Sequence, residues 1–416
     1  MSRVYASMRP AKVAVTGATG QVGSTLVHRL HNHGVNVVAA VRNTLGAALI
    51  HASTPGCDIR VGSLTPEPGR VHLLDDCDVI VNCALASSDG HPSQAYTRNR
   101  ALVDGLLEAK SLRWLIHLST AAVYGELIRE HRDEARAFRH PRPNSEYGRA
   151  KLSVERYAAW RARGRGITCS VLRLGHVYGA GTARSREIIE LARDPCFRLP
   201  YGGRFPSNAI HLDRVASAVL ALCGADAPRA LYSVAEPSNT WRDVFDWHTG
   251  CLGLPPVAAM SDAASDKGRH GYARRSLLRE VGAWIRTLPI TQLVRAPATF
   301  DLVLRILART PTAVTRRVAA GNRRLAVRGV AARALGGRTE PLPPLYYSTR
   351  MPGPFLTLPL DPATGPGSDR ARCRDLREWY QLWSTLKIHP RARVESESPD
   401  WAQIPFARGW REGSCS

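Results

Sequence analysis

Tyr147 and Lys151 stand four positions apart in the stretch YGRAK. This spacing places two side chains on the same face of a helix, one turn apart. A phenol with a pKa of about 10 is a poor acid–base group at neutral pH, but a neighbouring ammonium stabilises the phenolate and lowers that pKa. The pair could therefore give a proton to a carbonyl oxygen, or remove one from an alcohol, while a hydride moves. The same spacing also occurs by chance on surface helices.

A third polar group strengthens the catalytic interpretation. Residues 114–120, WLIHLST, predict a buried strand that ends at Thr120, with Ser119 beside it. Ligands of open parallel sheets bind beyond the carboxyl ends of the strands. A hydroxyl there would hydrogen-bond the reacting oxygen and stabilise its developing charge. We therefore predict Thr120, Tyr147 and Lys151 as the catalytic residues.

Three glycines, Gly17, Gly20 and Gly23, lie between an apolar run and an amphipathic one. Glycine permits a positive φ, and the missing Cβ atoms let backbone N–H groups approach a pyrophosphate. The positive end of the following helix favours the same negative charge. A tight turn alone would explain the glycines, but their place between a strand and a helix favours a dinucleotide site.

The end of the second predicted strand indicates which dinucleotide is bound. NAD sites usually place Asp or Glu there to accept hydrogen bonds from the ribose 2′-hydroxyl. Here the strand ends at Val41 and Arg42, and a guanidinium can pair with a 2′-phosphate. We predict NADP as the cofactor, with NAD left open. A solvent-exposed Arg42 without a ligand is the alternative.

These residues need elements that hold them together. Nearly apolar strands alternate with helices, which predicts a parallel sheet covered on both faces. The expected fold class is α/β: a doubly wound parallel Rossmann sheet, a smaller C-terminal substrate lobe and a basic helical extension. The predicted strands are 12–17, 35–41, 58–62, 78–86, 114–120 and 167–175, and the predicted helices include 24–34, 101–110, 147–164 and 240–253.

Four regions are expected along the chain. They are an NAD(P)-binding Rossmann domain over 11–176, a substrate-binding lobe over 177–270, a basic helical extension over 271–338, and a Pro-rich linker with a C-terminal segment over 339–416. Within the lobe, 207–224 predicts a short strand and a helix. A Thr cap predicts the start of the 240–253 helix.

Because the glycine loop, the hydroxyl and the Tyr/Lys pair occur in this order along the sequence, the chain resembles the extended short-chain dehydrogenase/reductases. It is most similar to their NAD(P)-dependent sugar-nucleotide epimerase/dehydratase branch. The resemblance spans roughly residues 12–253 and implies a homodimer in many members. It implies that the pyrophosphate loop is Gly17, Ala18, Thr19, Gly20, Gln21, Val22 and Gly23, that Ser63, Leu64, Ala84 and Asn99 add cofactor contacts, and that Ser119, Thr120, His176 and Arg204 face the substrate.

Several positions depart from that family pattern. The dehydratases carry Asp-Glu after the threonine, where this chain has Ala121 and Ala122, which cannot transfer protons. Dehydration and decarboxylation by those routes are therefore not expected. His176 and Leu174 replace an Asn and a Pro on the substrate side, and Ser63 stands where an Asp commonly contacts adenine.

The composition is that of a globular protein, with 44% hydrophobic and 22% charged residues. No apolar run is long enough to predict a membrane-spanning helix, and the first ten residues lack the apolar core of a secretory signal. Nine cysteines occur without a CxxC pair, which favours reduced thiols and a cytoplasmic location. No metal site is predicted.

The net charge of +22 comes almost entirely from arginine, since the chain has only five lysines. Residues 274–338 hold fourteen arginines against Glu280 and Asp301. Such a basic stripe can contact a membrane surface, nucleic acid or another polyanion. A solvated helical face is the plainer interpretation.

The sequence therefore predicts an NADP-dependent oxidoreductase that reduces a keto group of a sugar nucleotide or a related biosynthetic intermediate, with Tyr147 as proton donor. An NAD(P)-dependent sugar-nucleotide epimerase is the close alternative. A non-catalytic NADP-binding sensor is a third, although such proteins commonly lose the tyrosine or the lysine.

Overall fold

A computed structural model describes residues 12–66, 73–85, 92–125, 134–143, 145–223, 230–236, 238–263, 265, 350–353, 355–356 and 366–386. The chain divides into two compact units, and the first, Met1–Ala86 with Arg98–Met260 and Pro344–Trp383, holds nearly all of these residues. The fold below is that of this unit. The predicted basic extension, 271–338, lies outside the described residues.

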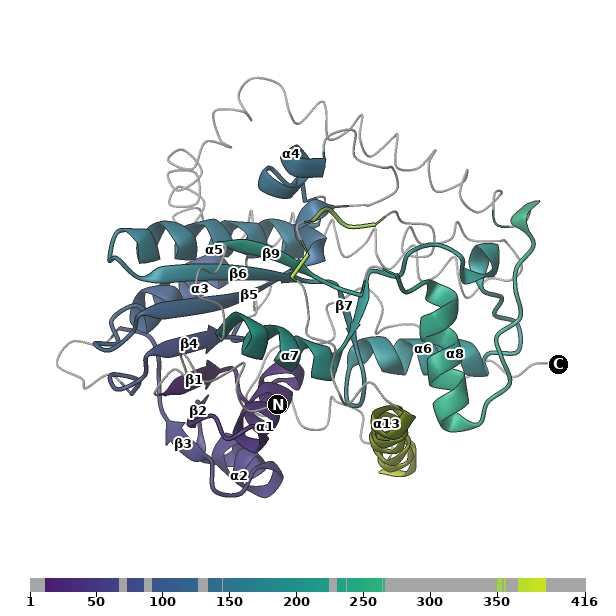
Figure 1. The fold of residues 1–416 in the computed structure, drawn as a ribbon, viewed down its shortest axis with the longest axis horizontal. Coiled ribbons are helices and arrows are strands. Elements are labelled where there is room, and N and C mark those ends of the chain that lie inside the picture. Colours follow the sequence, from purple (N-terminus) through teal and green to yellow (C-terminus); the bar gives the residue numbers. More distant parts are fainter. Residues whose placement is uncertain are drawn as a thin grey trace, which may run out of the picture. The chain divides into compact units, whose positions relative to one another are not determined.

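The elements follow one another as the alternating pattern predicts (Figure 1). In chain order they are β1 (Val13–Thr16), α1 (Gln21–Asn32), β2 (Val37–Val41), α2 (Thr44–Ser53), β3 (Asp58–Val61), β4 (Val79–Asn82), α3 (Pro92–Leu106), β5 (Trp114–Thr120), η1 (Ala121–Tyr124), α4 (Glu134–Arg139), α5 (Glu146–Arg163), β6 (Thr168–Leu174), β7 (His176–Tyr178), α6 (Ala183–Arg193), η2 (Pro200–Gly203), β8 (Ala209–His211), α7 (Leu212–Cys223), β9 (Leu231–Val234), α8 (Trp241–Leu252) and α13 (Pro366–Leu386).

Seven parallel strands form one sheet in the order β3-β2-β1-β4-β5-β6-β9 (Figure 1). The six predicted strands are present as β1 to β6, which confirms the α/β fold with a parallel sheet. From the adjacent strands β1 and β4, the sheet continues to β2 and β3 on one side and to β5 and β6 on the other. Their carboxyl ends therefore flank the crevice where ligands of such sheets bind. Strand β9 was not predicted, because four residues at the edge of a sheet leave little periodic signal.

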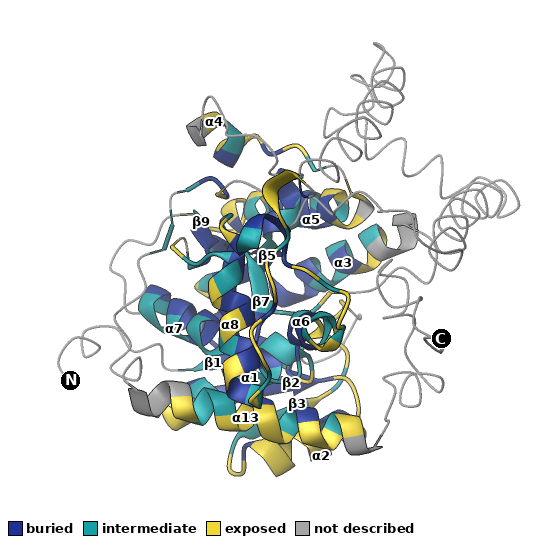
Figure 2. Ribbon diagram, turned by 90° about the vertical axis from the view of Figure 1, so that its right-hand side faces the viewer, coloured by how far each residue is buried: buried dark blue, intermediate teal, exposed yellow. Residues whose placement is uncertain are grey.

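Helices cover both faces of the sheet. On one face α1 and α7 pack on the strands, and Leu26 and Val215 share a buried core with Val15 of β1. On the other face α3 and α5 pack on the strands, and Val103 of α3 and Val154 of α5 belong to one buried core. Figure 2 shows the buried residues gathered on the strands and on the helix faces that cover them, while exposed residues run along α2 and α13. The two cores fix the strand ends that carry the candidate site.

A smaller layer follows the sheet. Strands β7 and β8 pair in parallel, and Tyr178 of β7 packs in one core with Ile188 of α6 and Trp241 of α8. The predicted cap of α8 is confirmed, because Thr240 accepts a hydrogen bond from the N–H of Asp243 at 3.3 Å and donates its own N–H to the Asp243 carboxylate at 2.8 Å. The predicted strand and helix over 207–224 are present as β8 and α7.

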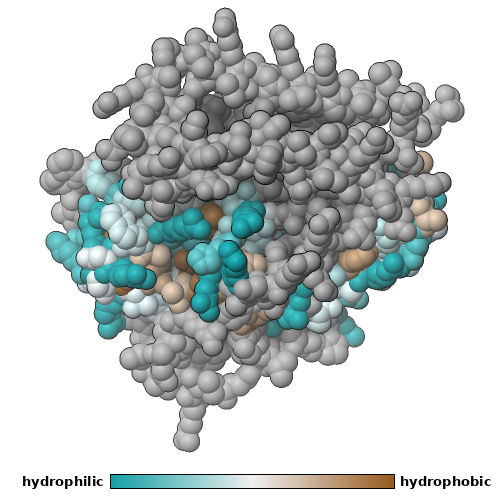
Figure 3. All heavy atoms as spheres, turned by 90° about the horizontal axis from the view of Figure 1, so that it is seen from above, coloured by the Kyte–Doolittle hydropathy of each residue, from teal (hydrophilic) through white to brown (hydrophobic). Residues whose placement is uncertain are grey.

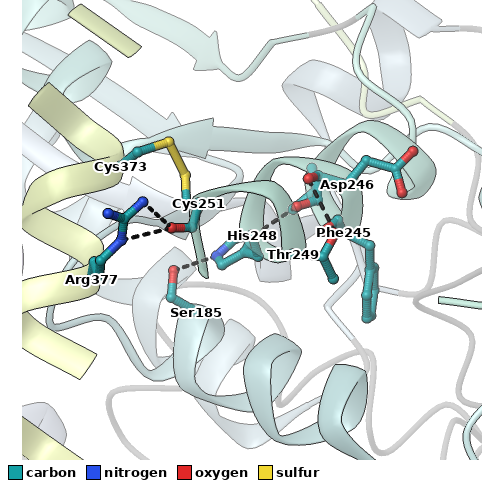
Figure 4. Close-up of a disulfide and its surroundings, with 9 residues drawn as sticks. Ser185, Phe245, Asp246, His248, Thr249, Cys251, Cys373 and Arg377 are labelled. Atoms are coloured by element: carbon teal, nitrogen blue, oxygen red, sulfur yellow. Dashed lines mark hydrogen bonds between the residues drawn. A yellow bond between two sulfur atoms is a disulfide. The ribbon is translucent and has the colours of Figure 1, made fainter. Parts of the chain in front are cut away.

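A disulfide between Cys251 and Cys373 joins α8 to α13 (Figure 4). The guanidinium of Arg377 donates two hydrogen bonds to the carbonyl of Cys251, at 2.9 and 3.1 Å. The prediction of reduced thiols is therefore wrong for this pair. Its members are 122 positions apart and form no motif, so only the fold reveals them.

On the face seen in Figure 3, the described residues are largely polar. In the view of Figure 3, hydrophilic residues dominate the coloured area, and hydrophobic ones show in small patches between them. Within the described ranges, no helix is both long enough and apolar enough to cross a bilayer.

Candidate active site

The glycine loop joins β1 to α1 and lies against the end of β4. Gly17 has a φ of +64°, and a Cβ there would stand 2.8 Å from the backbone nitrogen of Ala84. A Cβ on Gly23, in the first turn of α1, would stand 2.1 Å from the carbonyl oxygen of Gly17. Larger residues would force the loop away from both neighbours. The tight cradle and the uncapped N-terminus of α1, which has no acidic residue in its first turn, fit a pyrophosphate.

The other loop residues differ in where they point. Ala18 is buried and Thr19 is exposed, while Val22 packs partly buried against the core. The side-chain amide of Gln21 donates a hydrogen bond to the carbonyl of Gly181 at 2.6 Å. Gln21 therefore links the glycine loop to the turn that follows β7.

Tyr147 and Thr120 meet at the carboxyl edge of the sheet. Thr120 ends β5, and its hydroxyl lies near enough to the phenol of Tyr147, in the first turn of α5, to act on the pKa of that phenol. Tyr147 has 50% of its surface exposed to solvent. The hydroxyl of Thr120 also accepts the N–H of Ala122 at 3.2 Å, which fixes its direction. Two of the three predicted catalytic groups therefore lie close together.

The structure corrects one electrostatic expectation. The pKa of Tyr147 lies above its usual value of about 10, because desolvation of the phenol outweighs the opposing effect of the Thr120 hydroxyl. The net fall that the sequence predicts for this pKa is therefore wrong for the protein alone. At neutral pH Tyr147 is protonated, and it can donate.

Lys151 lies one turn further along α5, with its side chain buried against the sheet. Its ammonium donates a hydrogen bond to the carbonyl of Leu118 at 3.3 Å. Burial lowers the pKa of Lys151 to about 8, although Cys83 and Glu155 act in the opposite direction. A Cβ on Gly17 would stand 3.0 Å from the backbone carbonyl carbon of Cys83, whose thiol acts on Lys151, so Lys151 lies on the side of the glycine loop.

Ser119 lies apart from this constellation. Successive strand residues point to opposite faces, so Ser119 turns away from the face that Thr120 uses. Its hydroxyl donates to Glu155 at 2.9 Å, and Glu155 forms a buried ion pair with Arg173 of β6. The structure does not bring Ser119 to Tyr147; its hydroxyl instead anchors α5 to β5.

The predicted contacts around the cofactor are spread along the same edge. Arg42 is exposed directly after β2, next to Asn43, whose side chain caps α2 by accepting from Gly46. Ala84 follows β4 and donates its N–H to the hydroxyl of Thr16 at 3.4 Å. Asn99 is buried on α3.

Ser63 and Leu64 follow β3. The Ser63 hydroxyl is exposed and shares a hydrogen bond with Thr65 at 2.7 Å. Leu64 lies under α3, where a Cβ on Gly105 would stand 1.9 Å from its carbonyl oxygen. Their contact with a nucleotide stays a prediction.

Two of the predicted substrate-side residues, His176 and Arg204, come from the smaller layer. His176 starts β7 next to the ring of Trp241, at 5.7 Å between ring centroids, and burial lowers the pKa of His176 to about 3. Arg204 is exposed, with its guanidinium 5.2 Å from the centre of the Tyr201 ring. Ala121 and Ala122 follow Thr120 in η1 and supply no acid or base there.

Some residues that shape the site were missed. A Cβ on Gly148 would stand 2.3 Å from the carbonyl oxygen of Ala122, so this glycine lets α5 approach η1 and brings Tyr147 to Thr120. Its place beside Tyr147 was the available signal. No sequence signal marked Glu155, Arg173 or His117, because the role of each depends on pairing across the fold.

Comparison with known proteins agrees with this geometry. The sequence model described as NAD dependent epimerase/dehydratase family matches residues 13–194. That segment belongs to this family. It contains β1 through α6, and so the glycine loop, Thr120, Tyr147 and Lys151.

Three relatives illustrate the range of the family. The chain is 31% identical over 179 residues to a dTDP-6-deoxy-L-talose 4-dehydrogenase (NAD(P)(+)) of Kitasatospora kifunensis, over 41% of this chain and 54% of that protein. It is 28% identical to a 4-hydroxy-2-methyl-3-oxo-4-farnesyl-3,4-dihydroquinoline-1-oxide ketoreductase of Stigmatella aurantiaca, over 50% and 62%. It is 27% identical to a UDP-glucose 4-epimerase of Azospirillum brasilense, over 70% and 80%. The match spans little more than half the length of the first two relatives.

Proposed function

We propose that the chain is an NADP-dependent oxidoreductase that reduces a keto group of a sugar nucleotide or a related biosynthetic intermediate. The observation that carries this proposal is that Thr120 and Tyr147 lie close together at the carboxyl edge of the sheet. Lys151 follows one turn later on α5, close to the glycine loop. The family of residues 13–194 supports nicotinamide-dependent chemistry at this edge.

The proposed chemistry needs three side chains. Bound NADPH would supply a hydride to the carbonyl carbon. Tyr147 gives its proton to the carbonyl oxygen, which the hydroxyl of Thr120 holds by a second hydrogen bond. The ammonium of Lys151 stabilises the phenolate that remains. The raised pKa of Tyr147 supports this direction, because a protonated phenol is the form that donates.

Arg42 supports NADP over NAD. It is exposed at the end of β2, where the chain reads Val41, Arg42 and Asn43 and offers no carboxylate to a 2′-hydroxyl. A guanidinium can bind a 2′-phosphate with two parallel hydrogen bonds. The variant Arg42→Glu should therefore lose NADPH affinity and gain relative affinity for NADH.

The substrate class rests on the relatives and on what the site lacks. One relative's name gives a dTDP-deoxysugar and NAD(P)+, and another is a ketoreductase. With Ala121 and Ala122 after Thr120, the site offers no second acid or base at these two positions. Net reduction of a keto group needs no second acid or base at these positions.

An epimerase is the alternative, supported by the UDP-glucose 4-epimerase relative, which matches more of this chain than the other two. An epimerase returns the hydride to the same carbon and consumes no cofactor.

To distinguish the two activities, the purified chain is incubated with NADPH and a dTDP-4-keto-6-deoxysugar. The consumption of NADPH and the formation of the reduced sugar are then measured. Tyr147→Phe serves as the control. An epimerised product without NADPH loss would refute reduction, and NADPH binding without turnover of any keto sugar nucleotide would favour a sensor.

A further inference from the structure

Helix α13 is fixed to the helices of the smaller layer. The disulfide between Cys251 and Cys373 joins it to α8, and Arg377 donates to the carbonyl of Cys251 at 2.9 and 3.1 Å (Figure 4). On its apolar side, Leu376 shares a buried core with Ile189 of α6. The disulfide is the covalent part of this attachment, so it decides how firmly α13 is held.

Arg372 of α13 connects it to the helix that begins at the glycine loop. Its guanidinium lies 3.2 Å from a carboxylate oxygen of Asp213 on α7, and the same oxygen lies 2.5 Å from the guanidinium of Arg29 on α1. The side chains of Arg372 and Asp213 are only 10% and 15% exposed, so salt screens their attraction little. One carboxylate therefore links α13 to α1.

Trp379 of α13 lies beside the turn that holds the glycine loop. A Cβ on Gly181, in the turn after β7, would stand 4.0 Å from Nε1 of Trp379, an ordinary contact distance. The carbonyl of Gly181 accepts the side-chain amide of Gln21 at 2.6 Å. Gln21 is the first residue of α1 and part of the glycine loop. The contacts of Arg372 and Trp379 together form a brace between α13 and the start of α1.

We propose that this brace positions the cofactor loop, and that reduction of the Cys251–Cys373 disulfide by a dithiol releases the brace and weakens nucleotide binding. A loop already held in its binding geometry loses less conformational freedom when the nucleotide binds. Helix α13 lies beyond residues 13–194, so the brace is not part of the match to the family. The inference rests on the nucleotide site of the proposed function, but not on its substrate.

The redox step is a thiol–disulfide exchange. Cys251 is buried and Cys373 only partly so, which directs a thiolate of the dithiol to the sulfur of Cys373. The S–S bond breaks, and the sulfur of Cys251 leaves as a thiolate and takes up a proton. The second thiol of the reagent then attacks the mixed disulfide, closes its own disulfide and releases Cys373 as a thiol. Two electrons and two protons pass from the dithiol to the protein.

Nucleotide affinity in the two redox states tests the brace. The full chain is titrated with NADP+ and with NAD+ in a calorimeter, once oxidised and once with dithiothreitol. We expect the reduced chain to bind about tenfold more weakly, within the range of about 5–150-fold that is usual for coupled sites. The double variant Cys251→Ser, Cys373→Ser should bind as weakly with or without dithiothreitol. The exposed, free Cys196→Ser should behave as the wild type.

Thermodynamic linkage gives a second readout that needs no variant. If the oxidised chain binds the nucleotide more tightly, saturating nucleotide must favour the closed disulfide by the same factor. The wild-type chain is equilibrated in mixtures of reduced and oxidised dithiothreitol, with and without the nucleotide. Alkylation followed by peptide mass spectrometry then gives the fraction of Cys251 joined to Cys373. We expect the nucleotide to shift this equilibrium about tenfold.

Substitutions on the path of the brace separate it from general stability. In the oxidised chain, Trp379→Ala should weaken nucleotide binding about as much as reduction does. Gln21→Ala should weaken it and also diminish the further effect of dithiothreitol, because the turn then no longer holds the loop. Leu382→Ala is the matched control, since Leu382 lies on the same helix and is 59% exposed. If the reduced chain unfolds, as circular dichroism would show, the oxidised Trp379→Ala protein decides instead.

Equal dissociation constants in the two redox states, with the disulfide shown to be open, would overturn the proposal. A disulfide equilibrium that does not respond to the nucleotide, or failure of both NADP+ and NAD+ to bind the oxidised chain, would do the same. Tight, redox-dependent binding without turnover of a keto sugar nucleotide would overturn only the proposed function.

Discussion

The hydroxyl of Thr120 lies beside the phenol of Tyr147, although one ends strand β5 and the other begins helix α5. Gly148 makes this contact possible, since any Cβ there would meet the carbonyl oxygen of Ala122 at 2.3 Å. The position of the site is thus decided by the close approach of a helix to the turn after a strand.

Gly148→Ala should separate Tyr147 from Thr120. The added methyl group must push α5 away from η1, which costs about 1–3 kcal/mol of stability and lowers kcat about tenfold or more. Gly164→Ala is the control at the other end of α5, because its Cβ would have no neighbour closer than 3.6 Å. Urea denaturation and NADPH-dependent turnover measure the two effects. Equal unfolding free energies and equal turnover of the two variants would contradict the role given to Gly148.

Glu155→Gln should destabilise the protein strongly. Glu155 and Arg173 form a buried ion pair, and Gln would leave the guanidinium without a charged partner. Breaking such a pair costs about 3–5 kcal/mol. The comparison is Glu187→Gln, which breaks a more accessible ion pair with Arg184 on α6 and should cost less than about 1 kcal/mol. Similar unfolding free energies for both variants would argue against the proposed anchoring of α5.

The protein should lose stability in mild acid. Burial lowers the pKa values of His117, His176 and His211 to about 3 and that of His248 to about 4. The unfolded chain binds these protons at about pH 6.5, so it gains more protons than the folded state as the pH falls from about 6.5 towards 4. Each histidine then costs roughly 1 kcal/mol or more by about pH 5.

Urea midpoints across this range measure the loss. His248→Gln should reduce the slope of stability against pH, because it removes one buried imidazole, whereas the exposed His28→Gln should not. A midpoint that does not change between neutral pH and about pH 5 would exclude neutral buried histidines.

Reduction of the disulfide should loosen α13. Cys251 and Cys373 close a long loop, and cross-links of this kind contribute about 2–4 kcal/mol. The double variant Cys251→Ser, Cys373→Ser should unfold earlier and be cut by protease near α13, while the exposed, free Cys196→Ser should not. If a reductant leaves both the melting curve and the protease pattern of the wild type unchanged, the cross-link does not hold α13.

The local parts of the site could be predicted from the sequence. The glycine loop, the end of β5 and the first turns of α5 each carry their own periodic or spacing signal, and the parallel sheet brings them to one edge. The direction of Ser119 was predictable in principle, since neighbours on a strand face opposite ways.

Long-range pairing and burial were not predictable. The partners Ser119 and Glu155 lie on different elements, as do Cys251 and Cys373, and no motif marks either pair. The pKa of Tyr147 was expected to fall and rises instead, because desolvation depends on the packing around the ring. The domain boundaries, among them the limit at 176, and the contacts of Arg42 and Arg204 with ligands stay predictions.

Isotope transfer tests the central claim most directly. The wild-type protein is given NADPH carrying deuterium at C4 of the nicotinamide and a dTDP-4-keto-6-deoxysugar, beside Tyr147→Phe. We expect deuterium on the new carbinol carbon of the wild-type product. The rate in Tyr147→Phe should be about 10²–10⁴-fold lower at unchanged NADPH affinity, because the proton donor alone is lost. Product formation without deuterium, or equal rates in both proteins, would contradict hydride transfer with Tyr147 as the acid.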